Sequence, residues 1–219
     1  MTAPQKKKMM KTRIFKIEEV TKEIMLQAVN DLKNGAVIIA PTDTVYGIMA
    51  DALNPQAVKR MCEIKQKPSD VPLQYLASDI KYAKRIALFS PKATLLAEKY
   101  WPGPLTIIVP PSKEGKKYLR GFDTLGIRVP KNDFIANLLN AFGGVAAASS
   151  ANLHSKPVIN SQEELIKEFN GKVDYIFTGG QFSSESSTVL SLEPFKIFRE
   201  GGIKEKDVLN FFAENANIF

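Results

Sequence analysis

The sequence predicts a single α/β domain built around a mixed, twisted β-sheet. Short apolar runs rich in β-branched residues alternate with longer stretches of helical periodicity. Strict strand–helix repetition is absent, and two strand-like runs at 188–192 and 195–199 follow each other directly, which favours antiparallel pairs. No repeat, low-complexity linker or change in composition marks a second domain. We therefore expect residues 13–219 to form one domain after a disordered basic tail at 1–12.

The elements near the N-terminus have clear local signals. A strand is expected at 13–18, and Thr21 then caps a helix that ends at Asn34-Gly35. The β-branched run at 36–41 stops at Pro41, which is typical of a buried strand.

Proline and glycine divide the rest of the chain into elements. Asn54-Pro55 begins a helix that ends before Pro68, and Trp101-Pro102-Gly103-Pro104 stops a later helix because neither prolines nor glycine continue one. Gly143-Gly144 end another helix, and residues 111–121 are expected to be an exposed basic loop. The other elements are expected in this order: strand 73–77, helices 79–87 and 91–100, strands 105–109 and 124–130, helix 132–142, strand 145–148, helix 161–169, strands 173–177, 188–192 and 195–199, and helix 204–213.

The composition is that of an ordinary soluble globular protein. Thirty Lys+Arg against 23 Asp+Glu give a formal charge of +7, which favours anionic partners such as nucleotides or RNA. One cysteine, Cys62, excludes an internal disulfide and fits a reducing compartment, and its helical pattern predicts a small core residue. One histidine, His154, excludes a His-based metal site, whereas Mg²⁺ remains compatible because phosphates and water can hold it. No apolar run is long enough for a membrane span, so a cytoplasmic protein is expected.

Two segments combine polar groups with strand-like surroundings. Pro41-Thr42-Asp43-Thr44-Val45-Tyr46-Gly47 follows the strand at 36–41, where polar residues often face a ligand crevice. The same residues also fit a strand exit with side-chain caps. Arg128 lies inside the strand pattern Gly126-Ile127-Arg128-Val129-Pro130, so its guanidinium must meet either an anionic ligand or a structural carboxylate.

Three further cations allow two interpretations. Lys65 and Lys67 precede Pro68 in a loop between a helix and a strand, where they can bind phosphates or form a solvated charge run. Arg199 is followed by Gly201-Gly202, which would let the backbone approach a ligand closely.

Hydroxyl groups also cluster at two turns. Ser149-Ser150-Ala151-Asn152 and Ser186-Ser187-Thr188 can bind a ribose, phosphate or carboxylate, or can bond only to their own turns. No Ser–His–acid arrangement, P-loop or dinucleotide fingerprint is evident. The residues therefore favour the positioning of charged substrates over nucleophilic catalysis.

Seven motifs, taken in order, resemble the YrdC/TsaC family of threonylcarbamoyl-adenylate synthases over roughly residues 20–205. They are P-T-D-T-V-Y-G (41–47), K-Q-K-P…P-L (65–73), W-P-G-P-L-T (101–106), G-I-R-V-P (126–130), S-S-A-N (149–152), S-T-V (187–189) and R-E-G-G-I (199–203). The resemblance implies the single-domain form of the family, with a concave basic cleft over a twisted mixed sheet.

The resemblance also implies a reaction. L-threonine, bicarbonate and ATP would give L-threonylcarbamoyladenylate and pyrophosphate, with Mg²⁺ as cofactor. Other proteins of the pathway would transfer the threonylcarbamoyl group to adenosine 37 of tRNA.

Roles for individual residues follow from the matched motifs. The resemblance places Thr44, Arg128 and Ser187 at the threonine, with Arg128 on its carboxylate. The nucleotide positions are Lys65, Lys67, Thr124, Ser150, Asn152 and Arg199. Lys65, Lys67 and Arg128 would carry catalysis through positioning and charge neutralisation.

Two positions depart from the family pattern. Lys67 stands where arginine is usual, and lysine does not reproduce a planar two-pronged contact. Val71 replaces a residue that is commonly polar. The alternatives are a paralogous protein of the same fold without synthase activity, and an RNA-binding module, including one for double-stranded RNA.

Overall fold

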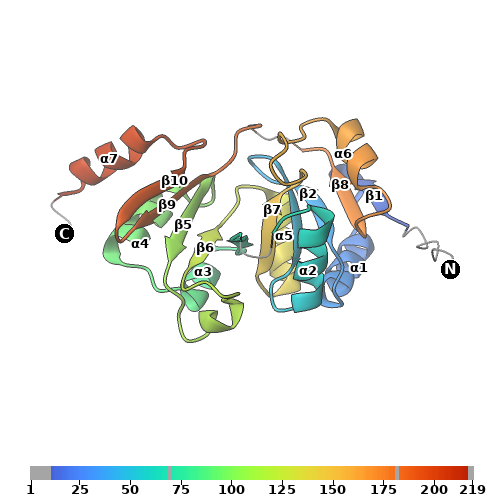
Figure 1. Ribbon diagram of the computed structural model, residues 1–219, viewed down its shortest axis with the longest axis horizontal. Helices are drawn as coiled ribbons and strands as arrows, with labels where there is room; N and C mark the ends of the chain where they lie inside the picture. Colours follow the sequence, from blue (N-terminus) through green and yellow to red (C-terminus); the bar gives the residue numbers. More distant parts are fainter. Residues whose placement is uncertain (1–10, 69–70, 181–182, 217–219) are drawn as a thin grey trace, which may run out of the picture.

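A single mixed β-sheet connects both ends of the molecule (Figure 1). The structure is a computed structural model that describes residues 11–68, 71–180 and 183–216. Within this part of the chain the sheet has ten strands in the order β1-β8-β2-β3-β7-β4-β6-β5-β9-β10. The strands are β1 (Arg13–Lys16), β2 (Ile38–Pro41), β3 (Tyr46–Asp51), β4 (Gln74–Leu76), β5 (Leu105–Val109), β6 (Leu125–Arg128), β7 (Ala146–Ser150), β8 (Tyr175–Thr178), β9 (Thr188–Leu192) and β10 (Phe195–Arg199).

The helices begin and end where local chemistry predicts. They are α1 (Lys22–Lys33), α2 (Pro55–Ile64), α3 (Ile80–Ile86), α4 (Pro91–Tyr100), α5 (Asp133–Phe142), α6 (Gln162–Phe169) and α7 (Glu205–Glu214). Thr21 Oγ1 accepts a hydrogen bond from Ile24 N, as expected of an N-cap, and Gly143 ends α5 in the left-handed conformation. None of the described helices is long and apolar enough to cross a membrane.

Three predictions need correction or lie outside the description. Tyr46 and Gly47 were expected to belong to a strand exit at 41–47, and no element was predicted for 48–51, but Tyr46–Asp51 forms β3, which pairs with β2 and β7. The loop at 111–121 is not uniformly exposed, because it contains a 3-10 turn at 115–118 whose Tyr118 is buried. The tail predicted at 1–12 lies almost entirely outside the described residues.

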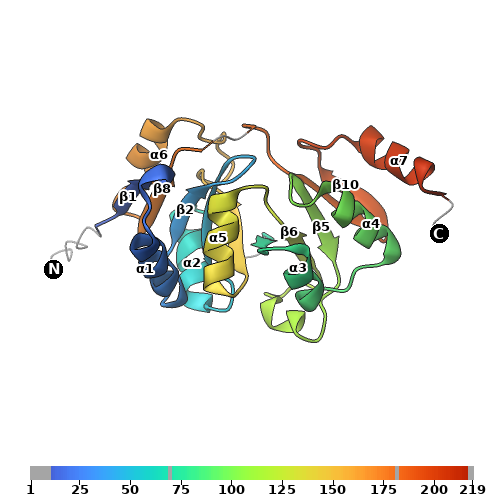
Figure 2. The same cartoon turned by 180° about the vertical axis from the view of Figure 1, so that it is seen from behind.

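Different helices pack on the two faces of the sheet, and Figure 2 shows α1 and α5 in front of the strands. Buried residues of α1 and α5 pack with Ile38, Met49 and Ala148 on one face. Those of α2, α3, α4 and α6 belong to a second core with Ile39, Ile48 and other strand residues. Because neighbouring residues of a strand point to opposite faces, these two cores occupy opposite sides of the sheet.

The register across the central strands positions one row of side chains. Ala148 in β7 pairs with Gln74 in β4, Gln74 pairs with Gly126 in β6, and Gly126 pairs with Ile108 in β5. Direct partners share a face of the sheet, so this row continues the face that carries α1 and α5. The alternate residues, such as Tyr75, pack into the opposite core. This row forms the floor of the cavity described below.

Candidate active site

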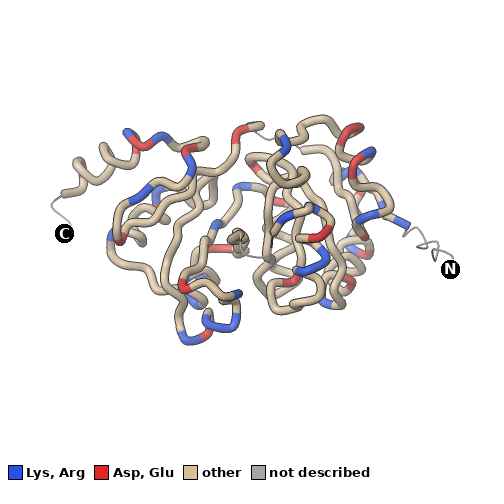
Figure 3. Tube along the Cα trace, in the orientation of Figure 1, with Lys and Arg blue, Asp and Glu red and all other residues tan. Residues whose placement is uncertain are grey.

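A cavity of about 380 Å³ lies over the central strands of the sheet. Its polar lining comes from Thr44, Lys67, Gln74, Thr106, Thr124, Arg128, Ser149, Ser150, Ser186, Ser187 and Arg199. Apolar residues, including Ile108, Phe122 and Phe198, complete the wall. Figure 3 shows that lysines and arginines are spread over the whole chain, so the cavity is distinguished by its shape and polar lining.

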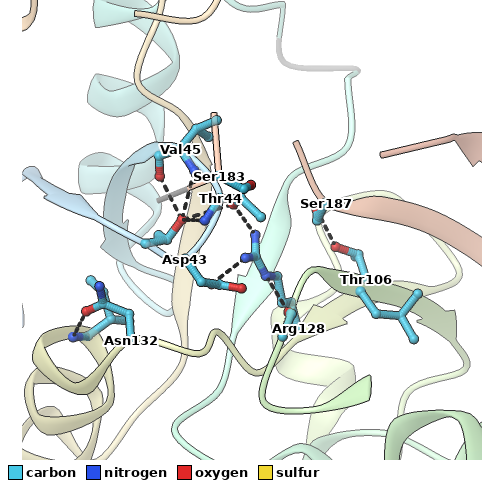
Figure 4. Close-up of polar contacts among 12 residues, drawn as sticks. Asp43, Thr44, Val45, Thr106, Arg128, Asn132, Ser183 and Ser187 are labelled. Carbon is cyan, nitrogen blue, oxygen red and sulfur yellow. Dashed lines mark hydrogen bonds and ion pairs between the residues drawn. The ribbon is translucent and has the colours of Figure 1, made fainter. Parts of the chain in front are cut away.

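Arg128 is held from three directions at one end of this cavity (Figure 4). It is 3% exposed, and its Nε donates to the Gly103 carbonyl at 3.0 Å. One terminal nitrogen, Nη1, donates to Thr44 Oγ1 at 2.9 Å, and Nη2 donates to Asp43 Oδ1 at 2.5 Å. A guanidinium has five N–H groups, so one hydrogen on each terminal nitrogen remains for a ligand. Burial lowers the pKa of Arg128, and the Asp43 charge opposes this shift.

The turn between β2 and β3 fixes the Thr44 hydroxyl. Thr42 Oγ1 donates to the Val45 carbonyl at 2.7 Å and accepts from the backbone N–H groups of Thr44 and Val45. It also lies 3.0 Å from Thr44 Oγ1. The two interpretations of this segment are therefore compatible, since side-chain caps hold a hydroxyl that lines the cavity.

The Trp-Pro-Gly-Pro segment supplies the carbonyl that holds Arg128. Trp101 Nε1 donates to the Leu105 carbonyl at 2.7 Å, and Gly103 N donates to the Val129 carbonyl at 2.8 Å. A Cβ at Gly103 would lie 2.3 Å from the Tyr100 carbonyl oxygen, so only glycine fits this turn.

Lys65 supports a turn and does not line the cavity. Its side chain is buried, and its Nζ donates to the backbone carbonyls of Ser150 and Asn152. Burial, followed by the charge of Lys67, lowers the pKa of Lys65 to about 8. Lys65, predicted to contact a phosphate, therefore lies behind the cavity wall, whereas Lys67 lines the cavity.

Asn152 is also turned away from the cavity. Its Nδ2 donates to the carbonyls of Leu153 and Lys156, and its Oδ1 accepts from Ser150 Oγ at 2.5 Å. Ser150 lines the cavity, whereas Asn152 holds the Ser150 side chain in place through this hydrogen bond. The structure therefore divides the predicted Lys-Lys-Ser-Asn set into two cavity residues and two supporting residues.

Arg199 and Ser187 act as one unit at the other end. Arg199 Nε donates to the Ser187 carbonyl at 2.9 Å, and its Nη2 donates to Ser187 Oγ at 3.0 Å. Burial lowers the pKa of Arg199. Both residues line the cavity together with Thr124. Ser187 was predicted to bind threonine and Arg199 to bind the nucleotide, and the two side chains hydrogen-bond to each other.

The glycines after Arg199 serve the fold. A Cβ at Gly201 would lie 2.0 Å from the Ser186 carbonyl oxygen, and Gly201 N donates to Thr188 Oγ1 at 2.9 Å. We expected these glycines to let the backbone approach a ligand. Instead, Gly201 lets the chain approach the backbone of Ser186 and Ser187.

The sequence did not identify two polar residues on the cavity floor, Gln74 and Thr106. Gln74 Nε2 donates to Thr106 Oγ1, and Thr106 Oγ1 lies 3.1 Å from Ser187 Oγ. Each is a single polar residue in an apolar strand pattern, and this feature of the sequence could have identified both as site residues.

The donor atoms at the cavity do not resemble a dedicated metal site. Within the described residues no group of three or more His, Cys, Asp and Glu side chains is placed to hold a metal ion. The cavity lining in this part of the chain contains no carboxylate. Cys62 is buried in the core, as predicted.

Comparison with known proteins gives concordant matches. The Sua5/YciO/YrdC family model, described as telomere recombination, matches residues 30–201. The chain is 32% identical over 209 residues to threonylcarbamoyl-AMP synthase of Pyrococcus abyssi, covering 93% of this chain and 62% of that protein. It is 34% identical over 201 residues to a putative threonylcarbamoyl-AMP synthase of Methanocaldococcus jannaschii, covering 89% and 95%.

Solved structures agree with these matches. The crystal structure of P. abyssi Sua5 complexed with L-threonine gives a TM-score of 0.83 at 32% identity, covering 91% of this chain and 60% of that one. E. coli YciO gives a TM-score of 0.81 at 26% identity, covering 90% and 99%. The chain therefore spans about three fifths of the length of the Pyrococcus relative.

Proposed function

The chain belongs to the Sua5/YciO/YrdC family, and from this premise we propose that it is an L-threonylcarbamoyladenylate synthase. One observation carries the proposal. Six residues from separate motifs line a single cavity together with Thr124: Thr44, Lys67, Arg128, Ser150, Ser187 and Arg199. The Pyrococcus and Methanocaldococcus relatives carry the synthase name, and a Pyrococcus structure contains L-threonine.

The amino acid would bind at the Arg128 end. Arg128 has one hydrogen left on each terminal nitrogen, which suits a carboxylate with two oxygens. Thr44 is fixed beside it, and Asp43 offsets the buried charge before the substrate arrives. Arg128 can therefore keep its ion pair with Asp43 and bind the substrate carboxylate at the same time.

The nucleotide would extend from Lys67 and Ser150 toward Thr124 and Arg199. Burial lowers the pKa of Lys67, Cys62 opposes this shift, and the positive charge of Arg199 adds to it. A polyphosphate between them would relieve this repulsion. Lys65 would act by holding the Ser150 turn.

Magnesium would enter with ATP. The lining described above supplies hydroxyls and cations and no carboxylate, so phosphate oxygens and water would provide most ligands of the ion. The ion would neutralise phosphate charge, which is its general role in phosphoryl chemistry.

The reaction then needs positioning more than a nucleophilic side chain. The threonine amine combines with bicarbonate to give a carbamate and water. A carbamate oxygen attacks the α-phosphorus of ATP, and pyrophosphate leaves with the bonding electrons. Arg128 would hold the amino acid while Lys67 and Arg199 hold the phosphates, which brings the two reacting atoms together. The product would supply tRNA modification in the cytoplasm through other proteins of the pathway.

The test is an assay with ATP, Mg²⁺, bicarbonate and L-threonine. We expect pyrophosphate release and a nucleotide product that both require threonine. Absence of threonine-dependent turnover at high enzyme concentration would instead favour a paralogous function on the same fold. Much higher turnover in a Lys67→Arg variant would show that lysine in place of the family's usual arginine limits the rate of the wild type.

Binding to RNA is separable from this activity. An RNA-binding module would bind RNA without threonine, and its affinity would fall steeply with salt concentration. Nitrocellulose filter binding between 50 and 200 mM salt, with and without threonine, distinguishes the two.

A further inference from the structure

Gln74 is half-buried and reaches the cavity floor because its neighbours are small. Its two direct cross-strand partners are Ala148 in β7 and Gly126 in β6. Directly opposed side chains normally cover each other across a sheet. A methyl group on one side and a hydrogen on the other leave the Gln74 amide accessible from the cavity.

The hydrogen bonds around Gln74 have a defined direction. Ser187 Oγ accepts from Arg199 Nη2 at 3.0 Å and from Gln74 Nε2 at 3.4 Å, which occupies both of its lone pairs. Its own hydrogen is therefore left for Thr106 Oγ1, 3.1 Å away. Thr106 Oγ1 also accepts from Gln74 Nε2. Two groups are left to face the cavity: the Thr106 O–H, which is a donor, and the Gln74 Oε1, which is an acceptor.

A donor beside an acceptor is complementary to a hydroxyl group. A hydroxyl accepts from one neighbour and donates to the other, whereas a carboxylate or phosphate only accepts and an ammonium only donates. An apolar group at the same place would leave both protein groups without a partner, which costs binding free energy.

The position of the pair identifies which hydroxyl it meets. Ile107 pairs with Ile127, so Thr106 lies beside Arg128 on the neighbouring strand. In Figure 4, Asp43 and Thr44 lie on one side of the Arg128 guanidinium, and Thr106 and Ser187 lie on the other. An amino acid held by its carboxylate on Arg128 would therefore extend its side chain toward Thr106.

We propose that Gln74 and Thr106 bind the side-chain hydroxyl of the amino-acid substrate and select threonine over its isostere valine. The inference rests on the proposed function, because it takes the carboxylate of the amino acid to be bound by Arg128. Ribose hydroxyls offer the same chemistry, so the experiment must separate the two sources.

The experiment is calorimetric titration of the full chain with L-threonine, L-serine and L-valine, each in the presence of Mg²⁺ and a non-hydrolysable ATP analogue. The wild type is expected to bind threonine at least about tenfold more tightly than valine, since a site built for a hydroxyl rejects the analogue without it. In Gln74→Leu and Thr106→Val the ratio is expected to fall below about threefold. Thr106→Ser keeps the hydroxyl and is expected to keep the ratio.

A matched control is Gln27→Leu, because Gln27 is exposed on α1, where it donates a hydrogen bond to Asp31. This variant is expected to retain the wild-type ratio. Folded Gln74→Leu and Thr106→Val proteins with an unchanged ratio would overturn the inference. The inference would also fail if these variants lost only the preference for the ATP analogue over its 2′-deoxy and 3′-deoxy forms. That result would assign Gln74 and Thr106 to the ribose hydroxyls. If the wild type binds no threonine at all, the proposed function fails and the inference fails with it.

Discussion

Among individual residues, Arg128 combines two demands that usually conflict. A buried guanidinium needs protein partners, and a substrate clamp needs unused donors. Gly103, Thr44 and Asp43 take three N–H groups and leave two. The partners thus keep the charge tolerable in the core and orient the remaining hydrogens.

We predict that Arg128→Lys weakens threonine binding at least about tenfold and lowers the free energy of unfolding by about 1–3 kcal/mol. Lysine retains the charge but does not reproduce the planar set of donors. Calorimetric titration with threonine and urea denaturation measure the two effects. Arg85→Lys is the control, because Arg85 is exposed and pairs with Glu114 at the surface. Unchanged threonine affinity in Arg128→Lys would contradict the carboxylate assignment.

A second prediction follows from the pKa of Lys65. This pKa is about 8 in the folded protein, against 10.5 for an unperturbed lysine. Between these values the unfolded chain binds more protons than the folded one, so stability rises with pH. We predict that the free energy of unfolding of the wild type, relative to Lys65→Met, increases by up to about 3 kcal/mol from pH 8 to 10.5.

Urea denaturation at several pH values measures this difference. Lys59→Met is the matched control, because Lys59 lies in α2, the helix that Lys65 follows, and its side chain is 71% exposed. Its difference from the wild type should not depend on pH. A pH-independent difference for Lys65→Met as well would mean that the folded protein does not perturb Lys65.

Among the helices and strands, the β9–β10 hairpin controls one end of the cavity. Arg199 ends β10, and Ser187 precedes β9. The following turn packs Gly201 against the backbone of Ser186. The position of both ligand-facing residues thus depends on a glycine that does not line the cavity.

We predict that Gly201→Ala destabilises the protein by about 1–3 kcal/mol and lowers turnover at least about tenfold, because the new methyl displaces Ser187 and Arg199. Gly202→Ala is the control, since its Cβ would lie 3.3 Å from Pro104 side-chain carbons. That smaller conflict is expected to cost less than about 1 kcal/mol. Chemical denaturation and the threonine-dependent assay compare the two variants, and equal effects would exclude the proposed strain at Gly201.

Local signals predicted most helices and strands, because caps and breakers act within a few residues. Asn132 and Ser161, for example, cap α5 and α6 through their side chains. Strand β3 was missed because no glycine or proline separates it from the hydroxyl-rich turn before it. Its strand character comes from pairing with β7, about a hundred residues away.

The site was predictable in part for the same reason. Motif residues such as Arg128 and Lys67 were identified, but the burial of Lys65 depends on a turn at 150–152 that is distant in sequence. Gln74 and Thr106 meet only because of the strand register, which the sequence does not specify locally.

For the molecule as a whole, the cavity joins residues from strands that are far apart in the sheet. Thr44 follows β2, the third strand in the order, and Arg199 ends β10 at one edge. A ligand that contacts both links strands that are far apart in the sheet order. One continuous sheet also supports the expectation that residues 13–219 unfold together.

We predict a single calorimetric unfolding transition that ATP with Mg²⁺, and threonine, each shift upward. At a ligand concentration of 100 times Kd, the stabilisation is expected to be about 2.7 kcal/mol. Differential scanning calorimetry measures both properties, with valine as the control ligand. Two transitions, of which only one responds to ligand, would instead divide the chain into two folding units.

The small residues on the cavity floor have a consequence for how such proteins diverge. A Cβ at Gly126 would make only an ordinary contact with Thr106, at 3.5 Å from its Cγ2. The backbone therefore has room for the methyl group of an alanine there. Substrate size in this architecture can change through the volume of two side chains, at 126 and 148, while the groups that hold the carboxylate and phosphates stay in place. A new substrate range is then accessible by single-base changes that leave the fold intact.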